Sequence, residues 1–314
     1  MINEAVICIG CIAVTITAMM LTSQQPKTKP RLANLHVTGE LALRRTKLDY
    51  VIEGVGKPCL VIGSSIYYPR TFSQELRKHL RMTFVDLPWF AKKTDIIPQA
   101  YSLEELVADI ERIRQKLNLD HFILVGHSIH GSVAFEYAKR HPEHVSRLVL
   151  IGAPNIFGNA EYDAATTDIW KTATPERQKL QSKNWQHLPD FKAHPELQPD
   201  IENYLAMSPK YWFNPTYDAR WLWRGMTINA DIFHHLYNDI FSNYRMFSGH
   251  PSVPVPTFVA VGKFDYIIPL PLWERYRSVP NLTLSIFEKC GHTPQLEEPR
   301  EFDGRLLGWL AEKL

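Results

Sequence analysis

The sequence predicts an α/β fold built around one large domain. Short apolar runs, with the length and composition of buried strands, alternate along the chain with segments whose apolar residues recur at helical spacing. The alternation is interrupted once, by a long aromatic-rich stretch between residues 155 and 253. A chain of 314 residues is long enough for one α/β domain with a substantial insertion.

The predicted elements follow one another in a regular order. The clearest helix covers residues 103–117, because its apolar residues lie on one face, and we expect it to pack on the sheet. The other predicted helices are 132–141 and 300–314. The predicted strands are, in order, 47–53, 59–63, 82–86, 121–125, 147–152, 256–261 and 281–287.

Ser128 lies in a glycine-flanked turn between the predicted strand 121–125 and the predicted helix 132–141. A serine in such a turn is typical of a nucleophile elbow, which exposes the hydroxyl at the end of a sheet beside the positive end of a helix. The usual spacing G-x-S-x-G would put glycine at position 130, where this sequence has His130, and the glycine follows at Gly131. Either the helix is shifted slightly or His130 fits beside the elbow. We expect His130 to be a structural replacement for glycine and not a second base.

The downstream sequence supplies an acid and a base in the order Ser, Asp, His. Asp265 follows the predicted strand 256–261, and His292 follows the predicted strand 281–287. In a hydrolytic triad the histidine takes the serine proton and later returns one to the leaving group, while the aspartate holds the imidazole in the required tautomer. Each residue alone would suit an ordinary loop. The three in this order at strand ends predict Ser128 as nucleophile, Asp265 as acid and His292 as base.

These motifs resemble those of the α/β-hydrolase superfamily over about residues 43–314. The resemblance implies the α/β-hydrolase fold, a mostly parallel central sheet flanked by helices, with an inserted helical cap. It also implies an oxyanion hole of two backbone N–H groups, which we carry over to Ile129 and Ser64, with Ser65 as the near alternative to Ser64. Ser64 and Ser65 belong to the loop after the predicted strand 59–63. Many relatives have His-Gly in this loop, and here only Gly63 matches.

Residues 155–253 are the stretch that the resemblance assigns to the cap, and residues 32–154 and 254–314 then form the core. The aromatic side chains of the cap predict an apolar pocket over the nucleophile, although we expect most of them to pack the cap onto the core. The residues predicted to bind substrate are Trp89, in an apolar loop near the pocket mouth, and Trp212 and Trp221 in the cap.

The predicted activity is cleavage of a carboxylic ester by a serine hydrolase, through an acyl-enzyme and without a cofactor. The aromatic cap favours a bulky, largely apolar ester, and the chain is similar to the esterases of this superfamily that open macrocyclic lactones such as macrolides. An aminopeptidase of the proline iminopeptidase kind is an alternative, but the loop after Gly63 lacks the glycine run that it would need. An epoxide hydrolase or dehalogenase would use an aspartate where Ser128 stands. A ligand receptor without catalysis is an alternative of another class.

Charge and cysteine content bear on the partners of the protein. A net charge of +2 gives no broad field for nucleic acid, so the predicted partner is a small-molecule substrate. No Cys/His spacing typical of zinc occurs, so the sequence predicts no metal site. The four cysteines do not form a disulfide framework and do not indicate a redox compartment.

Residues 1–31 form a separate apolar segment and linker. Residues 5–21 carry no charge and reach the lower edge of the length of a spanning helix. Basic residues follow only in the linker, which predicts a membrane anchor with the catalytic domain in the cytoplasm. Without this segment the protein would be cytoplasmic. A cleaved signal peptide, or a start codon at Met19 or Met20, would also account for the segment.

Overall fold

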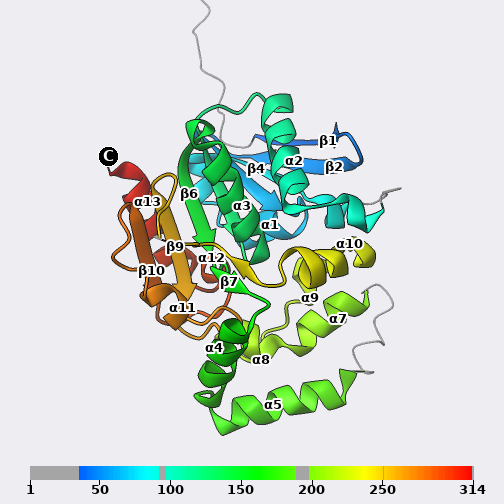
Figure 1. Cartoon of the computed structure of the whole chain (residues 1–314), viewed down its shortest axis with the longest axis vertical. Helices are drawn as coiled ribbons and strands as arrows, with labels where there is room; N and C mark the ends of the chain where they lie inside the picture. The colour runs from blue at the N-terminus through cyan, green and yellow to red at the C-terminus, as the bar shows by residue number, and fades with distance from the viewer. Residues whose placement is uncertain (1–34, 92–96, 189–197, 250, 313–314) are drawn as a thin grey trace, which may run out of the picture. The chain divides into compact units, whose positions relative to one another are not determined.

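The computed structural model describes residues 35–91, 97–188, 198–249 and 251–312. Within them an eight-stranded sheet runs in the order β1-β2-β4-β3-β5-β6-β9-β10 (Figure 1). The pairs from β4 to β10 are parallel, whereas β2 pairs antiparallel with both β1 and β4. The predicted α/β fold with a mostly parallel sheet is therefore confirmed. The strands are β1 (His36–Ala42), β2 (Lys47–Glu53), β3 (Lys57–Gly63), β4 (Leu80–Asp86), β5 (Phe122–His127), β6 (Val145–Ile151), β9 (Thr257–Gly262) and β10 (Leu282–Phe287).

Helices cover both faces of this sheet (Figure 1). The helices of the core are α1 (Tyr67–Thr71), α2 (Leu103–Lys116), α3 (Ile129–Arg140), α11 (Pro271–Glu274), α12 (Pro294–Glu297) and α13 (Pro299–Ala311). Short 3-10 turns are η2 (Leu76–Lys78), η3 (Pro88–Phe90), η4 (Pro98–Ala100) and η5 (Pro142–His144). The helix predicted at 103–117 is α2, whose N-cap Ser102 accepts a hydrogen bond from the Glu105 backbone N–H.

The side chains of the central strands alternate between two hydrophobic clusters. On β3, Leu60 and Ile62 belong to the cluster under α2 and α3, whereas Cys59 and Val61 belong to the cluster under α1 and α13. Because parallel strands are covered on both faces, they appear in the sequence as continuous apolar runs. Edge strand β1, which the sequence did not predict, has only Leu41 buried and therefore lacks that signal.

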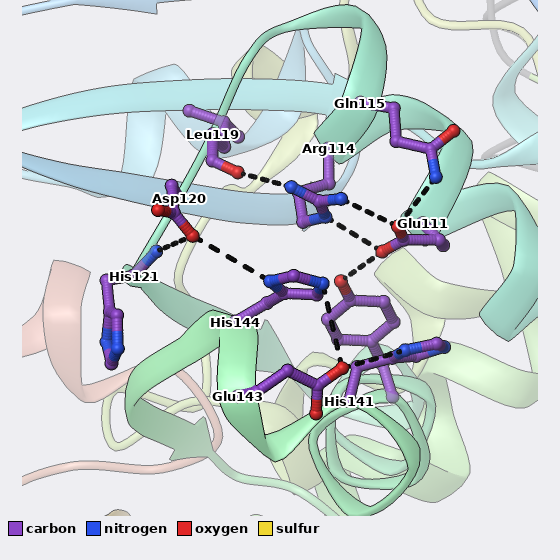
Figure 2. A network of polar contacts seen from close by, with 10 residues as sticks. Glu111, Arg114, Gln115, Leu119, Asp120, His121, His141, Glu143 and His144 are labelled. Atoms are coloured by element: carbon purple, nitrogen blue, oxygen red, sulfur yellow. Dashed lines mark hydrogen bonds and ion pairs between the residues drawn. The ribbon is translucent and has the colours of Figure 1, made fainter.

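A polar network ties α2 to α3, the helix that follows Ser128 (Figure 2). Glu111 on α2 accepts hydrogen bonds from the Arg114 guanidinium at 2.8 and 2.9 Å and from the Tyr137 hydroxyl of α3 at 2.8 Å. The hydrogen bonds from Arg114 lower the pKa of the Glu111 carboxyl to about 2. The carboxylate therefore stays charged at neutral pH and fixes the position of α3 against α2.

The chain between β6 and β9 holds the insertion and is mostly helical (Figure 1). Its ends are joined by β7 and β8, where Ile156 lies opposite Arg245 in an antiparallel pair. Arg177 on α5 donates to the backbone oxygens of Pro209 and Trp212 at 2.7 and 2.8 Å, which ties two parts of the insertion together. The elements are β7 (Ile156–Phe157), α4 (Ala160–Lys171), α5 (Pro175–Gln186), α7 (Pro199–Ala206), α8 (Ser208–Tyr211), α9 (Arg220–Trp223), α10 (Ala230–His235), the π-helical turn η6 (Leu236–Ile240) and β8 (Tyr244–Arg245).

Membrane association is a separate question for the two parts of the chain. Among the helices that the structure describes, none has the length and apolar character needed to cross a bilayer. The anchor predicted at residues 5–21 lies outside the described residues and stays a prediction.

Candidate active site

Ser128 lies at the junction of β5 and α3 with φ 55° and ψ −137°, a conformation that residues other than glycine rarely adopt. The turn requires the backbones around it to approach closely, and the flanking glycines allow this. A Cβ on Gly126 would lie 2.6 Å from the Gly131 Cα, and a Cβ on Gly131 would lie 2.3 Å from the Ala153 Cβ. Position 131 is therefore a place where the fold requires glycine, and position 130 tolerates the imidazole of His130.

The predicted acid and base lie in contact. The Asp265 Oδ2 atom is 2.7 Å from the His292 Nδ1 atom, and the two side chains are 0% and 1% exposed. Asp265 Oδ1 accepts from the backbone N–H groups of Ile267 and Ile268 at 2.9 and 2.8 Å, which fixes the carboxylate. Because an ionised carboxylate can only accept a hydrogen bond, Nδ1 of His292 must donate it and therefore carries the proton. Nε2 is left with a free lone pair.

His292 Nε2 is buried and makes no hydrogen bond with any atom of the described residues. His292 and Ser128 line the same cavity, so the structure brings the predicted base and nucleophile to one site. The hydrogen bond between base and nucleophile in such enzymes often forms fully only when substrate binds. The His292 backbone N–H donates to the Tyr211 backbone oxygen at 2.6 Å, so the insertion helps to hold this loop.

The structure separates the two candidates for the second oxyanion donor. The Ser65 backbone N–H donates to Asp86 Oδ1 at 2.6 Å and is therefore already used. Ser64 lines the cavity with Ile129, and its hydroxyl accepts from the Ile66 and Tyr67 backbone N–H groups at 3.1 Å, which orients the loop. The Ile129 N–H belongs to the first turn of α3, whose N–H groups lack partners within the helix. This arrangement favours the backbones of Ser64 and Ile129.

The cavity beside Ser128 has a volume of about 260 Å³ and a largely aromatic wall. Trp89, one of the three residues predicted to bind substrate, lies in this wall. Trp212 does not, because it is 1% exposed and packs against Tyr217 in the interior of the insertion. Trp221 is 38% exposed and donates its indole N–H to the Tyr217 hydroxyl, also away from the cavity. The wall contains Ser64, Tyr67, Tyr68, Trp89, Phe90, His127, Ser128, Ile129, His130, Asp200, Asn203, Tyr204, Met207, Tyr211, Trp223, Ile228, Phe233, Tyr237 and His292.

Glu297 is a site residue that no sequence pattern predicted. Its carboxylate accepts from the backbone N–H groups on both sides of His292, those of Gly291 at 3.0 Å and Thr293 at 3.1 Å. It also accepts from the Phe213 N–H of the insertion at 2.7 Å. Burial raises the pKa of the Glu297 carboxyl to about 7. No local pattern marks this residue, because its partners are backbone groups from separate segments.

The comparisons with known proteins agree with this fold. The family described as having the alpha/beta hydrolase fold matches residues 53–299, and the chain belongs to that family. It is 33% identical over 269 residues to the AB hydrolase superfamily protein YclE of Bacillus subtilis (strain 168), covering 84% of this chain and 95% of that protein.

More distant relatives include named esterases. The chain is 22% identical over 249 residues to a pimeloyl-[acyl-carrier protein] methyl ester esterase of Pseudoalteromonas atlantica, covering 77% of this chain and 87% of that protein. Among solved structures, an esterase from Exiguobacterium antarcticum aligns with a TM-score of 0.56 and 20% identity, covering 88% of this chain and all of that one. At this identity the structural likeness shows the fold alone. The chain is thus a member of a hydrolase family that includes esterases.

The described residues also bear on metal binding. Over the part of the chain that the structure describes, no cluster of three or more His, Cys, Asp or Glu side chains could hold a metal ion.

Proposed function

We propose that this protein is a serine hydrolase that cleaves a carboxylic ester through an acyl-enzyme on Ser128. The observation that carries the proposal is the buried Asp265–His292 pair: His292 has an Nε2 atom without a hydrogen-bond partner among the described residues, and it lines the same cavity as the strained Ser128. A receptor would need the cavity but not this pair, because binding alone requires no base.

The geometry supports one sequence of proton transfers. His292 Nε2 takes the proton of Ser128 Oγ as that oxygen attacks the ester carbon, and the Ile129 and Ser64 N–H groups hold the resulting oxyanion. His292 then gives the proton to the departing alcohol as the carbon–oxygen bond breaks. A water molecule repeats the attack on the acyl-enzyme with His292 as base, which releases the acid and restores Ser128. Throughout, Asp265 stabilises the charged imidazolium.

The cavity supports an ester with a mostly apolar skeleton, because aromatic side chains dominate the wall. Its volume of about 260 Å³ is close to the lower end of the range for ligand pockets, about 300–1,000 Å³. This favours a small or medium-sized ester over a macrocyclic lactone. The macrolide suggested by the sequence resemblance is the bulkiest candidate substrate. The cavity volume disfavours it, and the substrate panel below tests it directly.

An aminopeptidase of the proline iminopeptidase kind is the second candidate, and one observation favours it. Asp200 is the one carboxylate among the described wall residues and could bind a substrate amine, with Asn203 one turn further along α7. The Asp200 Oδ1 atom is already 2.9 Å from the His234 Nε2 atom, so the carboxylate is shared with a protein partner. We therefore rank peptide substrates below esters.

The test combines active-site labelling with a substrate panel. A fluorophosphonate should label Ser128 in the full chain and should fail to label Ser128→Ala, whereas Ser132→Ala, a buried serine change four residues away, should label normally. Methyl butyrate, a macrolide and a proline anilide should then be followed by mass. Faster cleavage of the anilide than of either ester would establish the aminopeptidase instead, and labelling at another residue would reject the assignment of Ser128.

A further inference from the structure

Two histidines flank the nucleophile, and the proposed proton transfers use neither. His127 is the last residue of β5 and His130 is in the first turn of α3, and they are 4% and 7% exposed. Burial lowers the pKa of both rings, that of His130 to about 4. Both rings are therefore neutral at neutral pH, and each carries one N–H donor and one acceptor nitrogen.

The hydrogen bonds of His127 determine its tautomer. His127 Nε2 lies 2.9 Å from the backbone oxygen of His292, and because a carbonyl oxygen only accepts, Nε2 carries the proton. His127 Nδ1 is then an acceptor, and the Tyr68 hydroxyl, at 3.2 Å, donates to it.

The hydrogen bonds of His130 determine the opposite tautomer. His130 Nδ1 lies 3.0 Å from the backbone oxygen of His127, so Nδ1 carries the proton. The Tyr68 oxygen lies 2.7 Å from the same nitrogen, so the single Nδ1–H is shared between the two oxygens, and the Tyr68 proton is directed to His127. Every hydrogen in this chain of three side chains is thus accounted for. His130 Nε2 is left as a lone-pair acceptor.

His130 lines the cavity, and its Nε2 atom is buried and has no hydrogen-bond partner among the described residues. The ring of His130 is held by stacking on Trp89, with centroids 5.3 Å apart and planes at 7°. It lies next to the loop of the proposed oxyanion hole, since a Cβ on Gly63 would be 3.1 Å from His130 Cε1. A buried acceptor without a partner raises the free energy of the free protein, and a ligand that donates to it removes that cost.

We propose that His130 Nε2 accepts a hydrogen bond from a hydroxyl group of the substrate close to the reacting ester, so that the protein prefers hydroxylated esters. This inference rests on the proposed function and specifies its substrate class. The hydroxyl is the donor of choice because the rest of the wall is mostly aromatic and the ring is neutral, so the site offers no countercharge for an ammonium group at this position. His130 is then a specificity residue and not a base.

The experiment compares kcat/KM for matched esters. The acyl series is methyl butyrate, methyl 3-hydroxybutyrate and methyl 3-methoxybutyrate, and the alcohol series is propyl butyrate, 2-hydroxyethyl butyrate and 2-methoxyethyl butyrate. In wild type, kcat/KM for the hydroxy ester of at least one of the two series should exceed kcat/KM for its parent ester by on the order of 10-fold. The methoxy ester should show no such gain, because an ether oxygen cannot donate.

His130→Phe keeps an aromatic ring for the stack on Trp89 but lacks the acceptor. The ratio of hydroxy ester to parent ester should fall to about 1 in this variant, and the ratio corrects for any general loss of activity. An unchanged ratio in His130→Phe, or equal rates for parent and hydroxy esters in wild type, would overturn the inference. If the variant does not fold, the hydroxy-to-methoxy comparison in wild type decides. Absence of all ester cleavage and of phosphonate labelling at Ser128 would instead reject the proposed function, and the inference with it.

Discussion

Replacing Asp265 by asparagine tests the proposed mechanism most directly, because the structure dictates how the new side chain will lie. Asp265 Oδ1 accepts from two backbone N–H groups, and Oδ2 accepts from His292 Nδ1. Asparagine has one oxygen. If that oxygen stays with the two backbone donors, two hydrogen bonds are kept and the amide NH2 faces His292. The reverse orientation would place NH2 against two N–H donors, which is less favourable.

In the favoured orientation the NH2 group donates to His292 Nδ1, and the proton of the neutral imidazole moves to Nε2. Nε2 then carries a hydrogen and cannot take a proton from Ser128. By analogy with the same change in a well-characterised triad, we expect kcat for ester hydrolysis to fall by about 10⁴-fold, which is about 5 kcal/mol of transition-state stabilisation. The free energy of unfolding should change little, because the backbone hydrogen bonds remain.

The assay is steady-state hydrolysis of methyl butyrate with urea unfolding of the same preparations. Asp303→Asn is a matched control, because Asp303 on α13 is also buried and accepts from the Ser73 hydroxyl away from the cavity. It should keep kcat close to wild type. Retention of more than about a tenth of wild-type kcat by Asp265→Asn would refute the tautomer argument and would mean that the acid lies elsewhere.

Three further predictions concern packing, pH and the cavity. Gly131→Ala should lower the free energy of unfolding in urea by about 1–3 kcal/mol, because its Cβ would lie 2.3 Å from another side chain, whereas Gly304→Ala, which meets nothing within 4 Å, should not. The raised pKa of Glu297, about 7 against an ordinary 4.5, stabilises the fold below pH 4.5, and this contribution is lost as the pH rises through 7. Glu297→Gln should therefore make the free energy of unfolding depend less on pH between pH 4.5 and pH 7. An unchanged pH dependence in this variant would contradict the raised pKa of Glu297. Trp223→Ala should raise KM for esters several-fold, because Trp223 lines the cavity. Trp221→Ala, on the other side of α9, should leave KM unchanged. Equal effects of the two changes on KM would show that the cavity does not bind the substrate.

The sequence alone predicted the elements whose signals are local. The parallel strands are buried on both faces, so they appear as apolar runs, and the strand predicted at residues 59–63 lies within β3, Lys57–Gly63. The elbow is also local, because the turn at Ser128 needs close backbone approach, and the glycines that allow it, Gly126 and Gly131, lie within three residues of Ser128 in the sequence. The order of Asp265 and His292 at successive strand ends was enough to predict their meeting, since parallel strands present their carboxyl ends at one edge of a sheet.

Only the tertiary structure decided which side chains form the cavity and what holds the base. Trp221 and Trp223 are two positions apart on α9, and at about 100° per residue they point in nearly opposite directions, so composition cannot tell which one faces the cavity. The partners of Glu297 are backbone N–H groups from the insertion and from both sides of His292, and backbone groups leave no trace in a sequence. The free acceptor of His130 has the same origin, because its tautomer is determined by a carbonyl oxygen and a tyrosine that folding brings beside it.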